Sequence, residues 1–323
     1  KLIENNNKKN RYKISLIPGD GIGKIVVPAA IKVLDATGLN FSYEEFEIGY
    51  DVFKKTGTSL PDEVINGLRK TDACLFGATT TPVDVPGYKS AIVGLRKAFD
   101  LYANLRPLKS YLIPTSISKN VDLMIVRENT EGMYSGIEYT VEDTAFAIRV
   151  VSQKASQRIA KTAFNLAHER KQKLTMVTKA NILRESCGLF RKTVFEVAKD
   201  FPDVEVTELF VDAIAMKLIR NPSEFDVILT TNLFGDILSD EAAGLIGGLG
   251  LAPSGCIGDN FGLFEPVHGS GTKMIEEGRG QQANPIATIL SASMMLKYLS
   301  EFEWANKINQ SIENVLNKNI MLT

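Results

Sequence analysis

Few cysteines occur in this sequence, and none lies where it could form a metal site or a disulfide framework. Three are spread over 323 residues, at Cys74, Cys187 and Cys256, and no CxxC pair is present. Zinc sites and disulfide scaffolds require paired or clustered cysteines. We therefore expect free, buried thiols in a reducing compartment.

Long apolar runs and a net charge of either sign are also missing. No stretch of about 18 apolar residues occurs, so we expect neither a transmembrane helix nor a membrane partner. The 37 basic and 38 acidic side chains nearly cancel, which gives no support to a nucleic-acid partner. The polar start, KLIENNNKKN, lacks a signal-peptide core and an initiator Met. We expect a frayed or processed tail on an intracellular protein, cytoplasmic or, if a transit peptide has been removed, mitochondrial.

Short apolar runs alternate with amphipathic segments, and this alternation indicates an α/β fold. Most of the runs end in polar or charged residues, and open α/β sheets bind ligands at the carboxyl ends of their strands. A helix is predicted after Asn284-Pro285, which is a good N-cap and first-turn pair. The apolar runs begin at Ile14, Ala73, Leu123, Leu174, Val206 and Asp226. The apolar face of another predicted helix consists of Ala155, Ile159, Ala163, Leu166 and Ala167.

The segment PGDGIG near the N-terminus resembles a dinucleotide-binding loop only in part. Gly19, Gly21 and Gly23 do not complete a GxGxxG pattern, and Asp35, the acidic residue that follows, lies within the next predicted helix. We interpret the segment as a strand-to-helix turn near the ligand and not as a Rossmann fingerprint.

The strongest local signal for chemistry is a pair of carboxylates in GDILSDEAAG. Asp236 and Asp240 are four residues apart, so on a helix they share a face, where a divalent cation would relieve their repulsion. Carboxylate oxygens suit Mg²⁺ or Mn²⁺. The alternative is a helix N-terminus, with Asp236 as the cap and Asp240 in the first turn. Asp212 ends the run VTELFVD, and a carboxylate at a strand end is open to both interpretations.

Three arginines, a tyrosine and a lysine lie near the ends of predicted strands. Arg96 and Arg106 flank LRKAFDLYANLRP, and Arg127 ends a strong apolar run. Because arginine binds carboxylates in a bidentate way, the three would suit a substrate with several carboxylates, whereas isolated salt bridges are the alternative. Tyr134 follows the same run and Lys179 ends another. Near cations, a lysine with a lowered pKa can act as a general base and a tyrosine as a proton donor.

One of the two histidines lies in a segment that is typical of a ligand-wrapping loop. His268 stands in EPVHGSG, together with Glu265, Gly269 and Ser270. A lone histidine is usually structural, which is the alternative for His268.

Six segments, in this order, resemble the β-decarboxylating dehydrogenases, which include the isocitrate, homoisocitrate and 3-isopropylmalate dehydrogenases. They are PGDGIG, LRKAFDLYANLRP, RENTEGMYSG, TKAN, NLFGDILSDEAAG and EPVHGS, and the resemblance runs from about Ile14 to the last residues. Six ordered matches are more specific than any single one, so they favour the functional interpretation of each motif over its structural alternative.

The resemblance implies an α/β, two-domain fold of the isopropylmalate-dehydrogenase type, with a mixed sheet flanked by helices and unlike the Rossmann fold. Residues 1–101 and 254–323 would form a discontinuous cofactor-binding domain, and residues 102–253 a domain for substrate, metal and dimerisation. The family also implies a homodimer or higher oligomer with shared active sites, in which Lys179 and Asp212 come from the neighbouring subunit.

The resemblance assigns a role to each matching residue. Tyr134 and Lys179 match the catalytic pair, and Asp212, Asp236 and Asp240 match the ligands of Mg²⁺ or Mn²⁺. The positions that match substrate contacts are Thr81, Ser90, Arg96, Arg106, Arg127 and Asn181. The positions that match cofactor contacts are Thr79, Thr80, Glu265, His268, Gly269, Ser270, Gly271, Thr272, Lys273 and Asn284.

The implied reaction is the metal-dependent oxidative decarboxylation of a small 2-hydroxy acid, with hydride transfer to a nicotinamide cofactor. In such a reaction Mg²⁺ chelates the 2-hydroxyl and the adjacent carboxylate, Lys179 accepts the hydroxyl proton, and Tyr134 helps to protonate the enol that remains when CO₂ leaves. Selectivity lies before the first arginine, where GYKSAIVGLRK most resembles homoisocitrate dehydrogenases. Ser90 can hydrogen-bond a distal carboxylate, while Ile92 and Val93 leave an apolar wall for an extra methylene. We therefore expect homoisocitrate dehydrogenase activity, as in lysine biosynthesis through 2-aminoadipate, with isocitrate and 3-isopropylmalate as alternative substrates.

The sequence departs from the family pattern at three places. Thr178 stands where the family usually has a histidine before the catalytic lysine, and Lys273 stands where NAD enzymes usually have an aspartate. Lys273 and Arg279 can meet a 2′-phosphate, so NADP is the alternative to NAD, which we expect. The chain ends at Thr323, where relatives continue into a glycine-containing segment and a helix, so we expect an incomplete C-terminus.

A function of another class is a non-catalytic regulatory subunit, which the family contains in hetero-oligomers. Such subunits tend to lose the tyrosine, the lysine or the metal carboxylates. Tyr134, Lys179 and the three aspartates are all present here, which favours an enzyme.

Overall fold

The computed structural model describes residues 8–318. The expectations about the tail before residue 8 and about the end of the chain lie outside the described residues. In the part of the chain that is described, no helix is long and apolar enough to cross a membrane. Cys74, Cys187 and Cys256 are all buried and free, which confirms the prediction for the thiols.

Within residues 8–318, ten strands form one mixed sheet in the order β2-β1-β3-β12-β11-β4-β5-β10-β8-β9. The antiparallel pairs lie together in the middle of the sheet, at β12–β11, β11–β4 and β4–β5, and parallel pairs lie on both sides of them. The bounds of the sheet strands are β1 Tyr12–Gly19, β2 Phe41–Glu45, β3 Ala73–Ala78, β4 Ala103–Lys109, β5 Asp122–Glu128, β8 Lys173–Thr178, β9 Glu205–Phe210, β10 Val227–Thr230, β11 Pro253–Ile257 and β12 Gly262–Pro266.

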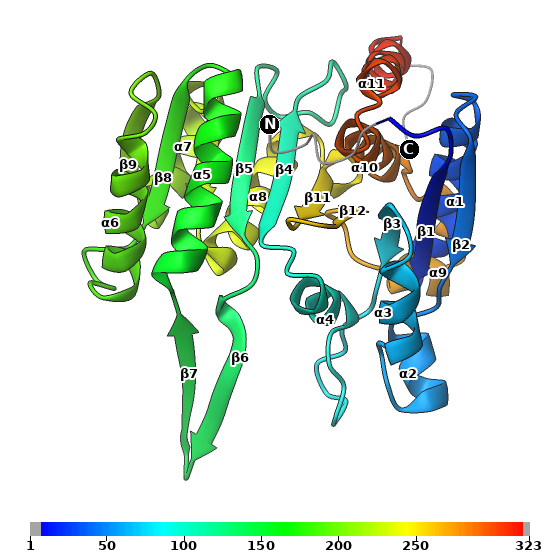
Figure 1. Ribbon diagram of the computed structural model, residues 1–323, viewed down its shortest axis with the longest axis horizontal. Coiled ribbons are helices and arrows are strands. Elements are labelled where there is room, and N and C mark those ends of the chain that lie inside the picture. The colour runs from blue at the N-terminus through cyan, green and yellow to red at the C-terminus, as the bar shows by residue number, and fades with distance from the viewer. Residues whose placement is uncertain (1–7, 319–323) are drawn as a thin grey trace.

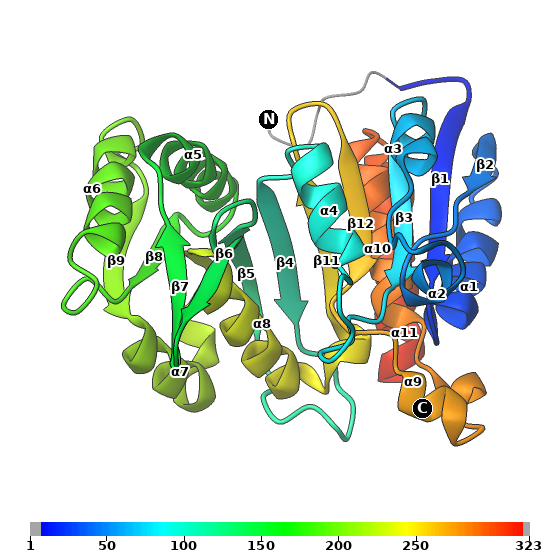
Figure 2. The same ribbon diagram turned by 90° about the horizontal axis from the view of Figure 1, so that it is seen from below.

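Helices cover both faces of this sheet, as predicted. Figures 1 and 2 show α5 and α6 on one face at one end of the sheet, with α7 and α8 on the opposite face. The bounds of the helices are α1 Gly23–Asp35, α2 Tyr50–Thr56, α3 Asp62–Leu68, α4 Ala91–Ala98, α5 Gln153–Glu169, α6 Ser186–Ala198, α7 Val211–Arg220, α8 Asn232–Ile246, α9 Thr272–Glu276, α10 Ile286–Tyr298 and α11 Phe302–Asn317, with short 3-10 turns at Pro222–Glu224, Leu249–Leu251 and Gly280–Gln282.

Alternation along the strands explains why both faces are apolar. On β1, Leu16 belongs to the main core with residues of α1 and α10, whereas its neighbour Ile17 belongs to a second cluster with residues of α3 and α4. Successive side chains of a strand point to opposite faces of the sheet. A strand that is covered on both sides must therefore be a continuous apolar run, which is the pattern that predicted these strands.

The six predicted apolar runs form β1, β3, β5, β8, β9 and β10. The predicted apolar face of α5 is buried throughout, and Asn284 Oδ1 accepts a hydrogen bond from the backbone N–H of Ile286 at the start of α10, at 3.0 Å. Two details are corrected. Helix α8 begins at Asn232, so the interpretation of Asp236 as a helix cap is wrong. Asp212 does not end a strand but lies in the first turn of α7, where the positive end of the helix dipole stabilises a carboxylate.

The predicted domain boundary lies in the middle of the sheet, where β4 and β11 pair. Residues of both predicted domains thus contribute strands to one continuous sheet. The division into residues 1–101 with 254–323 and residues 102–253 stays a prediction.

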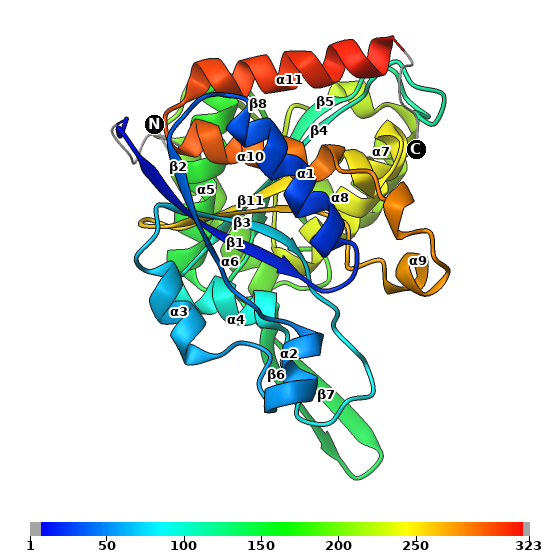
Figure 3. The ribbon, with the colours of Figure 1, turned by 90° about the vertical axis from the view of Figure 1, so that its right-hand side faces the viewer.

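A separate hairpin extends away from this body, as Figures 1 and 3 show. It consists of β6, Gly132–Val141, and β7, Thr144–Val150, which pair only with each other. The rings of Tyr139 and Phe146 stack across the two strands with their centroids 5.3 Å apart. Both rings are more than 40% exposed.

Candidate active site

Most of the predicted site residues line one cavity of about 370 Å³. The cavity lies beside the end of β3, and α4, β4, β5, β6 and α8 also contribute to its wall. The predicted residues that line it are Thr79, Thr81, Ser90, Arg96, Arg106, Arg127, Tyr134, Asp236, Glu265, His268 and Gly269. Ile92 and Val93, the predicted apolar wall, line the same cavity.

Arg127 comes from the end of β5 and is held by α8. Its Nε and Nη2 donate to Asn232 Oδ1 at 3.0 and 2.7 Å, and its Nη1 donates to Asp236 Oδ1 at 2.5 Å. Gly235 makes this approach possible, because a Cβ added there would lie 2.7 Å from Arg127 Cγ. The Arg127 side chain is 1% exposed, so its charge is fixed beside the cavity.

Tyr134, on β6, completes the surroundings of the Asp236 carboxylate. Its phenol O–H donates to Asp236 Oδ2, and its ring centroid lies 5.1 Å from the guanidinium carbon of Arg127. Burial and the hydrogen bond to Asp236 raise the pKa of Tyr134 above its ordinary value. The phenol is therefore protonated at neutral pH, which is the state that a proton donor requires.

Arg106 reaches the same carboxylate from β4. Its Nη2 lies 3.3 Å from Asp236 Oδ1 and its Nη1 lies 3.6 Å from Asp240 Oδ1, and Nη1 also donates to Ser239 Oγ. On its other side, Nε donates to Asn104 Oδ1 at 2.7 Å. Arg106 thus links the two carboxylates of α8 to the buried middle of the sheet.

The pKa values of the two carboxyl groups of α8 are shifted in opposite directions. Burial alone would raise the pKa of Asp236, but Arg127 and Arg106 outweigh burial and lower it, so Asp236 is ionised at neutral pH. At Asp240 burial prevails, and the pKa is raised. Burial together with Arg106 and Arg96 lowers the pKa of Arg127 to about 10, which leaves the guanidinium charged at neutral pH. The cavity therefore has positive charge to spare and suits an anionic ligand.

Arg96, the third arginine, lies on α4 and pairs with a carboxylate in the wall. Its Nη2 donates to Glu265 Oε1 at 2.9 Å, and both side chains are buried. Its Nε has no hydrogen-bond partner among the described residues. A buried N–H group without a partner favours a ligand that accepts a hydrogen bond from it. Glu265, which is predicted to contact the cofactor, also accepts from the Cys256 thiol at 3.3 Å.

Two of the predicted cofactor segments lie side by side. Thr80, in the loop after β3, donates from Oγ1 to Ser270 Oγ at 2.7 Å. Burial lowers the pKa of His268, so its imidazole is neutral at neutral pH. Its Nδ1 lies 2.9 Å from Gly269 O, and its buried Nε2 has no partner in the described part of the chain. With the proton on Nδ1, Nε2 is an acceptor.

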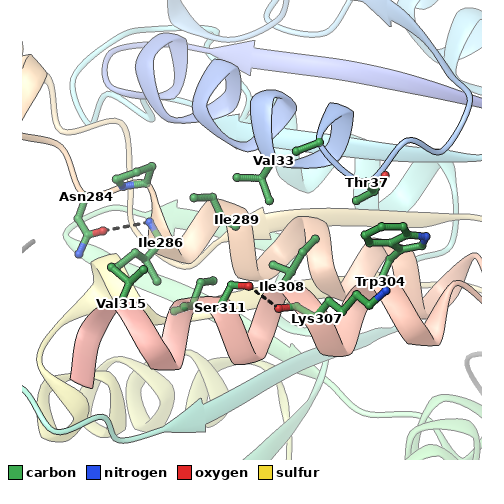
Figure 4. Close-up of a pocket in the computed structure, with 13 residues that line it drawn as sticks. Val33, Thr37, Asn284, Ile286, Ile289, Trp304, Lys307, Ile308, Ser311 and Val315 are labelled. Atoms are coloured by element: carbon green, nitrogen blue, oxygen red, sulfur yellow. Dashed lines mark hydrogen bonds between the residues drawn. The ribbon is translucent and has the colours of Figure 1, made fainter. Parts of the chain in front are cut away.

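The remaining predicted cofactor residues lie outside this cavity. Lys273, in α9, is largely exposed, and its Nζ lies 3.9 Å from Glu277, with which Arg279 also pairs. Asn284 lies at the edge of a second cavity of about 420 Å³ between α1, α10 and α11, where Figure 4 shows its bond to Ile286. Gly271 precedes α9, and Thr272 is the first residue of that helix.

Lys179 and Asp212 form a second group, apart from the cavity. Lys179 follows β8, and its Nζ lies 2.5 Å from Asp212 Oδ1 at the start of α7. The hydrogen bond from Lys179 lowers the pKa of Asp212. Asn181 is exposed near them. In residues 8–318, no group of three or more His, Cys, Asp or Glu side chains could hold a metal ion, so one chain does not bring Asp212 together with the two carboxylates of α8.

The sequence reasoning missed several residues that hold the arginines. Asn232 and Ser239 lie four residues before and three after Asp236, and Asn104 lies two residues before Arg106. These spacings put each of them on the same face of its helix or strand as the residue that it supports. Helical and strand periodicity around the predicted site residues was the signal that could have found them.

The chain resembles proteins of known activity over nearly its whole length. The model of the isocitrate/isopropylmalate dehydrogenase family matches residues 13–323. The isocitrate/homoisocitrate dehydrogenase of Thermus thermophilus is 52% identical over 309 residues, which cover 95% of this chain and 91% of that protein. The 3-isopropylmalate/3-methylmalate dehydrogenase of Methanocaldococcus jannaschii is 49% identical over 312 residues, covering 94% of this chain and 91% of that protein. The homoisocitrate dehydrogenase of the same organism is 45% identical over 317 residues, covering 94% and 90%.

The fold is also that of a solved relative. The crystal structure of isocitrate dehydrogenase from Methylococcus capsulatus matches with a TM-score of 0.92 and 44% identity, covering 97% of this chain and 93% of that one. The names of these relatives cover four acids, isocitrate, homoisocitrate, 3-isopropylmalate and 3-methylmalate, and all of the relatives are dehydrogenases.

Proposed function

The chain belongs to the isocitrate/isopropylmalate dehydrogenase family, a family of decarboxylating dehydrogenases that act on a CH–OH group with NAD(P) and a divalent metal, and we propose that its substrate is homoisocitrate. The observation that carries the proposal is the composition of the cavity. Three arginines line it, together with Ser90 at the start of α4 and the apolar side chains of Ile92 and Val93 in the first turn of that helix.

The cavity suits a tricarboxylic acid with a long distal arm. Arg96 pairs with Glu265, while Arg106 and Arg127 share Asp236, so the three arginines exceed these two carboxylates by one positive charge, which supports an anionic ligand. Ser90 offers a hydroxyl to a distal carboxylate, and its Oγ lies 3.5 Å from Thr81 Oγ1, so the two hydroxyls can act on one group. Ile92 and Val93 support the extra methylene of homoisocitrate over isocitrate. Because one methylene discriminates by only about 1–3 kcal/mol, we expect some activity on isocitrate as well.

Replacing Ser90 with alanine tests the distal contact. We expect kcat/KM for homoisocitrate and isocitrate to fall about tenfold or more, because a hydrogen bond to a charged group is worth about 1.5–3 kcal/mol. The value for 3-isopropylmalate, which carries an apolar branch in place of the distal carboxylate, should change little. Initial rates of Ser90→Ala and wild type on the three acids measure this. An equal loss on all three acids would contradict the role of Ser90.

The carboxylates of α8 fit a divalent cation. Asp236 and Asp240 lie one turn apart, offer only oxygen donors, and the first of them lines the cavity. Asp212 of a second copy would supply the third carboxylate. A cation held by these residues would lower the pKa of the 2-hydroxyl of the acid and would draw electrons away from the carbon that loses CO₂.

The side chains of this protein then have distinct tasks. The arginines bind the carboxylates and hold the acid with its 2-hydroxyl toward Asp236. Lys179 of the neighbouring subunit would accept the proton of the 2-hydroxyl while hydride leaves the same carbon for a bound nicotinamide. The carboxylate beta to the new carbonyl leaves as CO₂, and its bonding electrons form an enolate. Tyr134 gives a proton to the enolate carbon.

Replacing Tyr134 with phenylalanine should separate the steps of this reaction. The variant keeps the ring beside Arg127 but loses the O–H that donates to Asp236. We expect steady-state turnover to fall by a factor of about 10² to 10⁴, the usual worth of a general acid, with a burst of reduced cofactor before the slow phase. Stopped-flow absorbance of the reduced nicotinamide measures the burst. Unchanged turnover would remove Tyr134 from the proton-transfer step.

Exposed apolar side chains support a homodimer with shared sites. Met216 and Ile219 on α7 and Ile237 on α8 are each more than half exposed, on the helices that bear Asp212 and Asp236. The hairpin β6–β7 adds further exposed apolar residues, and an isolated pair of strands is only marginally stable without a partner. Several exposed apolar side chains on neighbouring helices are typical of an interface. A second copy that covers it would bring Lys179 and Asp212 to the cavity of the first.

The charges around Lys273, in the segment that is predicted to contact the cofactor, favour NAD over NADP. Lys273 and Arg279 are the cations that a 2′-phosphate would require, and both lie within 4 Å of the Glu277 carboxylate. That carboxylate neutralises part of their charge and would repel a phosphate. We therefore propose NAD as the cofactor.

The proposed function is tested by initial rates with homoisocitrate, isocitrate and 3-isopropylmalate, each with NAD and NADP, with Mg²⁺ and with a chelator. We expect the highest kcat/KM for homoisocitrate with NAD and Mg²⁺, and no turnover with the chelator. A strong preference for 3-isopropylmalate would contradict the role of Ser90, and full activity with the chelator would contradict the metal site. A chain that turns over none of the acids but activates a partner would be a regulatory subunit.

A further inference from the structure

The PGDGIG turn between β1 and α1 packs between two segments of the predicted cofactor site. Gly19 has φ +71°, and a Cβ added there would lie 2.0 Å from Ala78 O at the end of β3. Gly21 has φ +56°, and a Cβ added there would lie 2.0 Å from Ser270 O. Only glycine allows so close an approach in this backbone conformation. The turn therefore touches the start of loop 79–81 on one side and loop 268–272 on the other.

Asp20 lies in the middle of this turn, and its carboxylate accepts hydrogen bonds from backbone N–H groups of two other segments. Its Oδ2 accepts from Thr80 at 2.8 Å and from Tyr50 at 2.9 Å, and its Oδ1 accepts from Asp51 at 3.1 Å. The side chain is buried. Gly49 leaves room for the carboxylate, because a Cβ added there would lie 2.4 Å from Oδ2. Hydrogen bonds to a carboxylate are about twice as strong as those between neutral groups.

The hydrogen bond to Thr80 completes a set of contacts beside the cavity that join the turn to both loops. Thr80 Oγ1 donates to Ser270 Oγ at 2.7 Å, and Ser270 O accepts from the backbone N–H of Ile22 at 2.8 Å. Asp20 and Ile22 belong to the same turn. The turn, loop 79–81 and loop 268–272 thus hold one another, and Thr79, Thr81 and His268 of these loops line the cavity.

We propose that Asp20 is a positioning residue for the nicotinamide cofactor, which holds loop 79–81 against loop 268–272 so that the two parts of the cofactor site keep a fixed separation. The inference rests on the proposed function, because these loops contact a cofactor only in that proposal. A carboxylate suits the position because three N–H donors converge on its two oxygens. An amide would direct its own N–H₂ group at one of those donors and leave it without a partner.

Dinucleotide binding to the Asp20→Asn variant tests this role without turnover. NADH and NADPH are titrated by nicotinamide fluorescence, and homoisocitrate with Mg²⁺ is titrated by calorimetry. We expect the Kd for the dinucleotide to rise about tenfold or more, since bonds to a charged group are lost. The Kd for the acid should change less than about twofold, because its arginines lie on α4, β4 and β5 and none of them touches Asp20.

Asp72→Asn is the matched control. Asp72 precedes β3 at the opposite end of the same strands, and its carboxylate also accepts a backbone N–H, that of Lys13 at 2.8 Å. This variant should lose comparable stability in thermal unfolding but keep its affinity for NADH. Asp20→Ser, which places no amide hydrogens against the three donors, is the second variant if Asp20→Asn does not fold.

The possible results separate the two proposals. If the wild type binds neither dinucleotide, the proposed function fails and the role of Asp20 with it. If the wild type binds and the Asp20 variants bind equally well, only the role of Asp20 is overturned. Equal weakening in the Asp20 and Asp72 variants would assign the effect to general loosening and would also overturn it. The role of Asp20 would also be overturned if both Asp20 variants failed to fold while Asp72→Asn folded.

Discussion

Replacing Asp236 with asparagine should lower kcat/KM by about a thousandfold or more and remove the response to added Mg²⁺, because a catalytic cation supplies several kcal/mol of transition-state stabilisation. The side chain keeps its shape, so the loss would follow from its charge. The Asp236 carboxylate lies 2.5 Å from Arg127 and 3.3 Å from Arg106, and it accepts a hydrogen bond from the phenol O–H of Tyr134. Rates across a Mg²⁺ titration, together with Mn²⁺ binding followed by electron paramagnetic resonance, measure both effects.

Disorder among the arginines could also inactivate this variant, so metal binding must be separated from it. Asp240→Asn serves for this purpose, because Asp240 is half exposed and its Oδ1 lies 3.6 Å from Arg106 Nη1. We expect this variant to lose Mn²⁺ affinity while keeping its affinity for the acid. Glu241→Gln, a change of the same kind on the next residue of α8, should alter neither. Wild-type Mn²⁺ affinity in both aspartate variants would contradict the metal site.

Features of the fold that depend on neighbours in the chain were predictable from sequence. The strands of the sheet that are buried on both faces appear as unbroken apolar runs, and α5 shows its apolar face at helical spacing. The strands in the middle and at the edge of the site were not predicted. In β4, Asn104, Arg106 and Pro107 interrupt the apolar pattern, because the polar side chains of that strand support the cavity. Its strand character comes from pairing with β5 and β11, which are distant in sequence.

The candidate site divides in the same way. The spacing of Asp236 and Asp240 was enough to assign them to one helix face. It did not predict the residue at which that helix begins. Arg127 donates hydrogen bonds to Asn232 and Asp236, and Gly235 leaves room for its side chain. These contacts join residues more than 90 positions apart, so no local sequence pattern could have predicted them. The convergence of three backbone N–H groups on Asp20 is likewise a product of tertiary structure, so the PGDGIG motif predicted the turn and not its contacts.

A heterodimer of two inactive variants should recover activity. We expect Lys179→Met and Asp236→Asn each to be inactive as homodimers. If Lys179 serves the cavity of the other subunit, the heterodimer has one site that combines an intact Asp236 with an intact Lys179, and a second site that carries both defects. Co-expression with two different affinity tags and purification by both gives this heterodimer, and we expect about half of the wild-type activity per dimer, as two-fold symmetry requires.

The matched control combines Lys179→Met with Asp212→Asn. These two residues are in contact in one chain, at 2.5 Å, so both would be donated together to the partner's cavity. In that heterodimer one site receives the defective lysine and the other receives the defective aspartate, and neither should be active. Sites formed within one chain predict no recovery in either heterodimer, whereas donated sites predict recovery in the first pair alone. The pattern across the two pairs therefore reports which subunit supplies Lys179 and Asp212 to each cavity, independently of how strongly each variant is impaired.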